Sequence, residues 1–207
     1  LGQGSGPWKI PDPKNLPKIE VSHPDSSARG EDGFMPYARD ENEARPWAIP
    51  GTTGLEHRIG GLEKENITGM VSQDPENHQL MTDIRARKVE NITQEIPPSE
   101  IHGEPKGKLL VLGWGSTHGA IHVAVDRALA KGRSVSQMHL RWVSPFPSDL
   151  KAICDEFDEI LIPEVNSGQL ALLLKGELAR EIHQLNIVRG EPFRASEIED
   201  KINEILG

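Results

Sequence analysis

The segment Gly113–Gly119, GWGSTHG, brings glycines, hydroxyls and a histidine together directly after the apolar run KLLVL. Glycines at such a position let a backbone approach a phosphate, and a following helix points its amide groups at the anion. The spacing is G-x-G-x-x-x-G, which differs from that of dinucleotide-binding turns, and no Lys-Ser/Thr pair of a Walker loop follows. A tight strand-to-helix turn, in which glycine relieves crowding, is therefore favoured over a nucleotide site.

A stand-alone nucleotide-binding module is the competing interpretation of the same turn. The acid that normally holds a ribose at the end of the second strand is missing, and an arginine that suits a 2′-phosphate stands there instead. The residues of this alternative site are Gly113, Gly115, Ser116 and Arg141.

His118 and His122 are four residues apart, so one helix face would present both imidazoles, as in some metal sites. The sequence shows no third ligand and no intervening glutamate. The histidines are therefore interpreted as core-edge or solvent residues, and no metal site is predicted.

The segment Pro163–Leu170, PEVNSGQL, closes a predicted strand at the sheet edge where ligands or partners bind. Glu164 follows an apolar run, so it should be half-buried with a hydrogen-bond donor for its carboxylate. Asn166 or Ser167 could cap the next helix, and capping is compatible with contact to a partner. No catalytic or cofactor-binding residue is identified. The candidates for an active-site wall or a domain contact are Gly115, Ser116, Thr117, His118, Glu164, Asn166 and Gln169.

Composition excludes several functional classes. The 207 residues carry a net charge of −9, which disfavours a nucleic-acid partner. No apolar run is long enough for a membrane helix, and no secretory signal opens the sequence, so a cytoplasmic location is expected. The single cysteine, Cys154, rules out an internal disulfide framework, and its apolar and acidic neighbours indicate a buried, inert thiol. Leu1 in place of Met suggests part of a longer protein.

Strands and helices alternate regularly from Lys108 to the end of the chain, over residues 108–207. Short connections between alternating strands and helices predict a mostly parallel sheet covered on both faces, a three-layer α/β/α domain. The predicted strands are 108–113, 134–143, 158–164 and 186–190, and the predicted helices are 117–132, 149–157, 168–182 and 195–207.

Residues 1–73 have a different pattern, since eight of the 16 prolines precede position 51. We predict a long extended, proline-rich arm whose aromatic residues are buried, partly against surfaces outside 108–207. A helix and linker follow over 74–107, with Asp74 as N-cap and Pro75 at the first helical position. The predicted anchors are Trp8, Phe34, Tyr37 and Trp47, and the predicted apolar helix face is Leu80, Ile84, Ala86, Val89 and Ile92.

Several stretches together resemble the alpha subunit of 2-oxoacid:ferredoxin oxidoreductases, most of all the 2-oxoglutarate enzyme. They are FMPYARDENEARPWAIPGTTGLEHRIGG, TGMVSQDPENHQLMTDIRARKV, LLVLGWGSTHGAIHVAVDRALAKG, WVSPFP and PEVNSGQLALLLKGEL. The resemblance implies that residues 108–207 form a transketolase C-terminal-like domain. Residues 1–73 would then be the arm leaving a thiamine-pyrimidine domain that this chain lacks.

The resemblance also implies a place in a larger enzyme. Family members oxidatively decarboxylate a 2-oxoacid to acyl-CoA and pass the electrons to ferredoxin. The complex would use thiamine diphosphate, Mg²⁺, an iron–sulfur cluster and coenzyme A, none of them bound by this chain alone. The partners would be the remainder of the alpha subunit, the beta subunit and ferredoxin. The chain alone is expected to be inactive, with a structural and assembly role, and the turn at 113–119 would shape a domain surface.

Overall fold

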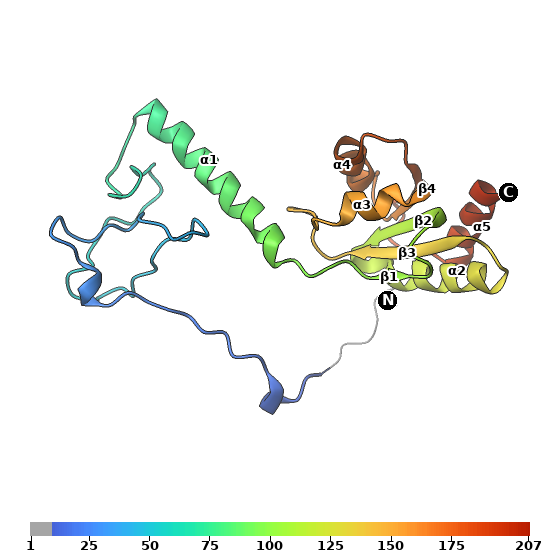
Figure 1. The fold of residues 1–207 in the computed structure, drawn as a ribbon, viewed down its shortest axis with the longest axis horizontal. Coiled ribbons are helices and arrows are strands. Elements are labelled where there is room, and N and C mark those ends of the chain that lie inside the picture. The colour runs from blue at the N-terminus through green and yellow to red at the C-terminus, as the bar shows by residue number, and fades with distance from the viewer. Residues whose placement is uncertain (1–9) are drawn as a thin grey trace. The chain divides into compact units, whose positions relative to one another are not determined.

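The computed structural model of the chain describes residues 10–207, in two units that are treated separately here, Ile10–Glu95 and Ile96–Gly207. The second unit holds a five-stranded sheet with the order β1-β3-β2-β4-β5 (Figure 1). Strands β2 to β5 are parallel, and β1 pairs antiparallel with β3 at one edge. The strands are β1 Ile101–His102, β2 Gly107–Trp114, β3 Val135–Leu140, β4 Phe157–Glu164 and β5 His183–Asn186.

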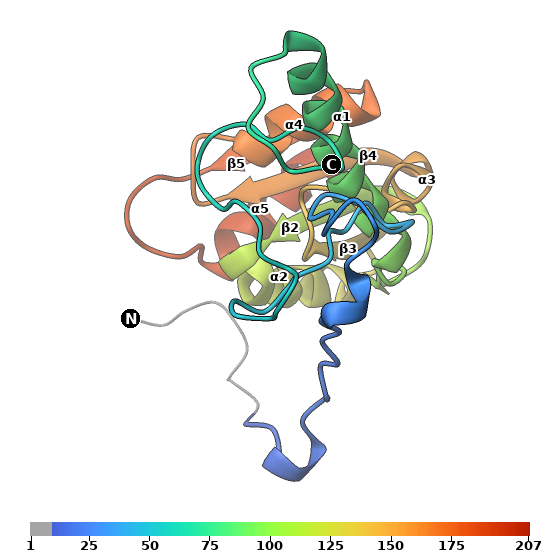
Figure 2. The same ribbon diagram turned by 90° about the vertical axis from the view of Figure 1, so that its left-hand side faces the viewer.

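Helices cover both faces of the sheet, as the alternating pattern predicted. Figures 1 and 2 show α3 and α4 on one face and α2 and α5 on the other. The α/β/α fold class is therefore confirmed. The helices of this unit are α2 His118–Ala130, α3 Leu150–Asp155, α4 Gln169–Leu178 and α5 Ala195–Leu206.

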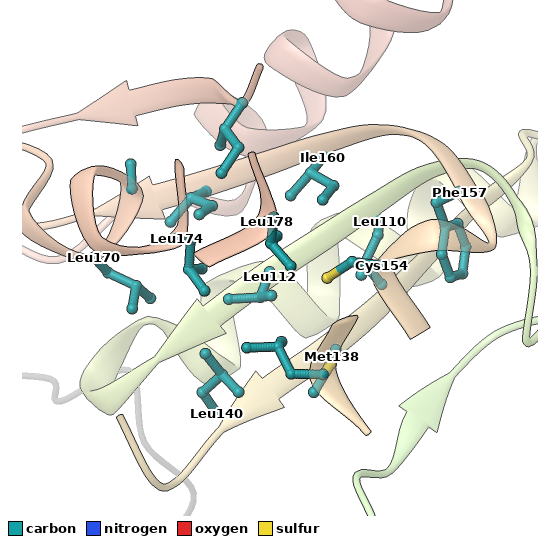
Figure 3. Packing of buried hydrophobic residues seen from close by; sticks show 14 residues of the cluster. Leu110, Leu112, Met138, Leu140, Cys154, Phe157, Ile160, Leu170, Leu174 and Leu178 are labelled. Atoms are coloured by element: carbon teal, nitrogen blue, oxygen red, sulfur yellow. The ribbon is translucent and has the colours of Figure 1, made fainter. Parts of the chain in front are cut away.

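Two apolar clusters hold the three layers together, one on each face of the sheet. Side chains alternate along β2, so Leu110 and Leu112 face α3 and α4, whereas Leu109 and Val111 face α2 and α5. Cys154 lies within the first cluster (Figure 3). These four side chains are fully buried, which explains why this part of β2 is a continuous apolar run in the sequence.

The two edge strands differ from the sequence prediction. The fourth predicted strand, 186–190, is mostly loop, with Val188 74% exposed, and β5 lies earlier at His183–Asn186. Strand β1 falls inside the predicted linker. Both are short, and β5 alternates between half-buried and exposed positions. Short, partly exposed edge strands contain few consecutive apolar residues, so hydrophobicity along the sequence does not reveal them.

The unit Ile10–Glu95 contains the helix α1, Pro75–Asn91, and is otherwise built from turns, isolated bridges and short 3-10 helices. The 3-10 helices are Pro13–Asn15, Ser26–Ala28 and Ile92–Glu95. Asp74 caps α1 as predicted, since its side chain accepts a hydrogen bond from the Glu76 amide. The predicted apolar face is wrong except at Ile84, because Leu80, Val89 and Ile92 are exposed. The residues that α1 buries are Asn77, Met81 and Ile84.

A buried asparagine explains which face of α1 packs. Asn77 Nδ2 donates to the Lys64 carbonyl at 2.9 Å, and its Oδ1 accepts from the Asn66 amide at 2.9 Å. The loop before α1 therefore satisfies its backbone groups with an amide side chain of the helix. A prediction from hydrophobic periodicity treats asparagine as exposed. It therefore placed the buried face of α1 on a neighbouring set of residues.

The proline-rich arm is not confirmed as an architecture. Phe34 and Tyr37 are partly buried, and the Phe34 ring meets His57 edge-on at 5.3 Å. Trp47 is 72% exposed, so the described chain does not bury it. Trp8 lies outside the described residues. The boundary between the two structural units falls after Glu95, so α1 belongs to the same unit as the residues that precede it.

Candidate functional site

The carboxyl ends of β2 and β4 lie at the point where the strand order changes direction. The chain passes from β2 to β3 on one side, and β4 then pairs with β2 on the other side. In open parallel sheets this switch point is where ligands bind. Trp114 and Glu164, the last residues of the two strands, meet there, and Trp114 Nε1 donates to Glu164 Oε2 at 3.4 Å.

Glu164 is fully buried and its carboxylate receives several hydrogen bonds. The backbone amides of Leu170 and Ala171, in the first turn of α4, donate to it at 3.0 and 2.9 Å. The side-chain amide of Asn166 donates at 2.9 Å, so that with Trp114 the carboxylate has four donors. A carboxylate at a helix N-terminus satisfies amides that have no partner within the helix and complements the helix dipole. The sequence predicted the donors, but the burial is more complete than expected.

Asn166 and Gln169 lie beside Glu164 at the start of α4. Asn166 Oδ1 accepts from the Gly168 and Gln169 amides at 2.7 and 3.2 Å. The N-cap residue of α4 is Gly168, so Asn166 supports the turn that leads into the helix and is not its N-cap. Gln169 itself is exposed and contributes its backbone amide.

Local structure explains the first two glycines of the turn Gly113–Gly119, Gly113 by close packing and Gly115 by its backbone conformation. A Cβ on Gly113 would lie 2.4 Å from Ile121 Cδ1, so this position has no room for a side chain. Gly115 has open space around it but a φ of +57°, which L-residues seldom adopt. Thr117 donates its hydroxyl to the Trp114 carbonyl at 2.8 Å, and Ser116 is exposed. Packing and turn geometry account for this spacing.

A cavity of about 550 Å³ lies beside the start of α2 and the end of β3. Val135 faces α2 and Met138 faces α3 and α4, so the alternation of β3 turns Gln137 and His139 toward α2. The segment 97–102 closes another side. The polar lining is rich in imidazole and consists of Ser99, Glu100, His102, His118, His122, Gln137, His139 and Arg141.

The environment of the cavity disfavours protonated imidazole. Burial lowers the pKa of His139 to about 4, with further contributions from His118 and Arg141. Burial also lowers the pKa of His118, reinforced by His122 and Arg141. Among the described residues, His139 Nδ1 is a buried side-chain nitrogen without a hydrogen-bond partner. Both shifts favour the neutral form of the two rings, in which one ring nitrogen can accept a hydrogen bond.

His122 has the neighbour His118 that their spacing predicted, and two further neighbours that it did not. The two rings stack at 5.7 Å between centroids, and His102 lies closer to His122, at 4.4 Å. Asp126 follows one turn later on α2, with Oδ1 at 2.6 Å from His102 Nε2 and Oδ2 at 3.6 Å from His122 Nε2. Sequence reasoning missed this group because His102 lay in a predicted linker. An i, i+4 search that included acids would have found His122 and Asp126.

Comparison with known proteins gives a consistent result along the whole chain. Residues 107–199 match the model of the pyruvate:ferredoxin oxidoreductase core domain II. The 2-oxoglutarate oxidoreductase subunit KorA of Mycobacterium tuberculosis is 42% identical over 201 residues, covering 96% of this chain. The alpha subunit of 2-oxoacid:ferredoxin oxidoreductase 2 of Aeropyrum pernix is 27% identical over 182 residues, covering 85% of this chain and 26% of that protein. The chain belongs to the family of 2-oxoacid:ferredoxin oxidoreductase alpha subunits.

A solved member of this family shares the fold of the chain. The structure of the 2-oxoglutarate:ferredoxin oxidoreductase of Magnetococcus marinus, with 2-oxoglutarate, coenzyme A and succinyl-CoA bound, matches with a TM-score of 0.85 at 28% identity. That match covers 95% of this chain and 34% of the other chain. The chain spans about 30% of the length of KorA.

The residues of the present chain do not fit an iron–sulfur cluster. Cys154 is its single cysteine, its thiol is buried, and burial raises the pKa to about 11, so the thiolate that a cluster needs is disfavoured. The carboxylate of Glu164 is occupied by the amides of α4.

Over residues 10–207, the structure contains no helix with the length and apolar character to cross a membrane.

Proposed function

We propose that this chain is part of the alpha subunit of a 2-oxoacid:ferredoxin oxidoreductase that acts on 2-oxoglutarate. The complete enzyme would convert 2-oxoglutarate and coenzyme A into succinyl-CoA and CO₂, and would pass two electrons to ferredoxin. The observation that carries this proposal is the match, over 95% of the chain, to an enzyme that binds 2-oxoglutarate, coenzyme A and succinyl-CoA. The 42% identity to a 2-oxoglutarate oxidoreductase subunit supports the same substrate.

Within that enzyme we assign this chain a structural role and place the redox chemistry on other parts of the complex. Thiamine diphosphate, Mg²⁺ and the iron–sulfur cluster would be bound elsewhere, because Cys154 and Glu164 are committed to the core and to α4. The remainder of the alpha subunit and the beta subunit would be its partners, in the cytoplasm. Of the predicted wall residues, Gly115, Ser116, His118, Asn166 and Gln169 would offer the surface to the active-site region, and the buried Thr117 and Glu164 would support it from behind.

Activity measurements test the assignment directly. We expect the co-expressed complete alpha and beta subunits to reduce ferredoxin in a reaction that requires both 2-oxoglutarate and coenzyme A. The 207-residue chain alone should give no reduction above the rate without protein. Reduction by the chain alone would contradict the structural role. A complete enzyme that used another 2-oxoacid with a higher kcat/KM would contradict the substrate.

Two leucines on α4 are suited to the assembly role. Leu172 and Leu173 are 73% and 56% exposed, while Leu174 on the same helix is fully buried in the core. Burying one such side chain contributes about 1.5–3 kcal/mol. Most of the length of KorA lies outside the matched part, so the complex supplies ample further surface. We propose that the remainder of the alpha subunit covers these leucines with an apolar surface.

Charged substitutions separate assembly from folding. We expect Leu172→Asp with Leu173→Asp to leave the unfolding midpoint of the 207-residue chain within error of wild type. In the complete enzyme the same change should weaken subunit assembly at least tenfold, because the carboxylates would have to be desolvated. Size-exclusion chromatography and light scattering measure this. Asp200→Asn on α5, an exposed single-charge change on the other face, is the control. Equal assembly in all three proteins would dismiss the leucine contact.

A further inference from the structure

Two imidazoles and a carboxylate converge at the mouth of the histidine-lined cavity. Their ligand atoms, one each from His102, His122 and Asp126, all lie within 4.8 Å of one another, and no other such group occurs among residues 10–207. His122 and Asp126 are one helical turn apart on α2. His102 comes from β1, which pairs with β3 beside Gln137. Two unrelated elements therefore aim their side chains at one point.

Gln137 determines the tautomer of His122. The amide nitrogen of Gln137, a residue that is 3% exposed, donates to the His118 carbonyl at 3.4 Å. Its oxygen therefore faces His122 Nδ1, 3.1 Å away, and accepts a hydrogen bond from the Nδ1–H group. A neutral His122 then carries a lone pair on Nε2. Histidines that bind metals characteristically donate their other ring N–H to a carbonyl oxygen in this way.

The Nε2 lone pair of His122 is directed toward an anion. Asp126 Oδ2 lies 3.6 Å from this nitrogen, and Oδ1 lies 2.6 Å from His102 Nε2. A divalent cation placed between the His122 nitrogen and the carboxylate would convert this contact of a lone pair with an anion into two metal–ligand bonds, and His102 Nε2 is close enough to add a third. In a tetrahedral zinc site with bonds near 2.1 Å, ligand atoms are about 3.4 Å apart. The pair of His122 and Asp126 lies close to this separation, and the ligand atom of His102 is within 4.8 Å of both.

We propose that His102, His122 and Asp126 bind a divalent transition-metal cation of the Zn²⁺ type. Two imidazoles and one carboxylate are ligands that favour such ions over Mg²⁺ or Ca²⁺. The three side chains are 42%, 42% and 52% exposed, so water reaches the remaining coordination position. The ion would tie the two-residue strand β1 to α2 and thereby fix one wall of the cavity. This site does not depend on the 2-oxoacid activity.

Calorimetric titration of the 207-residue chain with ZnCl₂ tests the site. We expect one Zn²⁺ per chain with micromolar affinity. Both His102→Gln and Asp126→Asn should weaken binding by at least about tenfold. Zn²⁺ should also raise the thermal unfolding midpoint of the wild-type chain but not of the two variants, because a ligand of the native state stabilises it. All three ligands are partly exposed, so these substitutions leave the apolar core intact.

His183→Gln is the matched control. His183 Nε2 lies 2.9 Å from Glu159 Oε2, and the two side chains are 41% and 50% exposed, but no second imidazole joins this pair in the described part of the chain. The control variant should bind Zn²⁺ like wild type. Absence of binding to wild type at millimolar Zn²⁺ would overturn the proposal. Undiminished one-to-one binding by both ligand variants would overturn it as well, since the ion would then lie elsewhere.

Discussion

Glu164→Ala is expected to lower the free energy of unfolding by about 3–5 kcal/mol, the largest effect predicted for a single side chain here. The substitution leaves the Leu170 and Ala171 amides without a partner in a buried position. It also removes the acceptor for Trp114 and Asn166. Urea unfolding of the 207-residue chain, followed by far-UV circular dichroism, measures the loss.

Glu164→Gln is the informative comparison for this prediction. Glutamine has nearly the same shape and retains one acceptor oxygen, but its NH₂ group would face backbone donors. We expect a loss of about 1–3 kcal/mol, between wild type and alanine. An alanine variant within about 1 kcal/mol of wild type would show that water replaces the carboxylate at α4. The stabilising role of Glu164 would then be wrong.

Gly113→Ala is expected to lower the free energy of unfolding by about 2–3 kcal/mol, because the added methyl group overpacks the core. It would lie 2.4 Å from Ile121 Cδ1 and 3.0 Å from Thr117 Oγ1. Ile121 is fully buried on α2, so its Cδ1 could move aside only by displacing other core side chains. Helix α2 would therefore have to shift away from β2. The unfolding midpoint in urea measures the change.

Gly115→Ala adds the same methyl group two residues later and is the control. Nothing lies within 4 Å of a Cβ at this position, and only the φ of +57° opposes a side chain. The expected loss is about 1 kcal/mol, the cost of a left-handed conformation for alanine. Equal losses in the two variants, or a larger loss at Gly115, would contradict the assignment of close packing to Gly113.

The α/β/α layers could be predicted from the sequence because their signals are local. The apolar run of β2 and the apolar periods of α2 and α4 each lie within one element, and short connections then require a parallel sheet. The edge strands β1 and β5 could not be predicted in the same way. Each is short and partly exposed, so pairing with a neighbouring strand defines it more than its own residues do.

The site divides along the same line. The burial of Glu164 and its need for donors followed from the sequence alone, because an acid directly after a buried strand must be hydrogen-bonded. Only the tertiary structure brought His102 together with His122 and Asp126, since antiparallel pairing of β1 with β3 is a long-range contact. The buried face of α1 also differs from the predicted one, because Asn77 satisfies backbone groups of a preceding loop. Local periodicity reports apolar burial within one element, whereas polar groups are buried according to partners that folding brings from elsewhere in the chain.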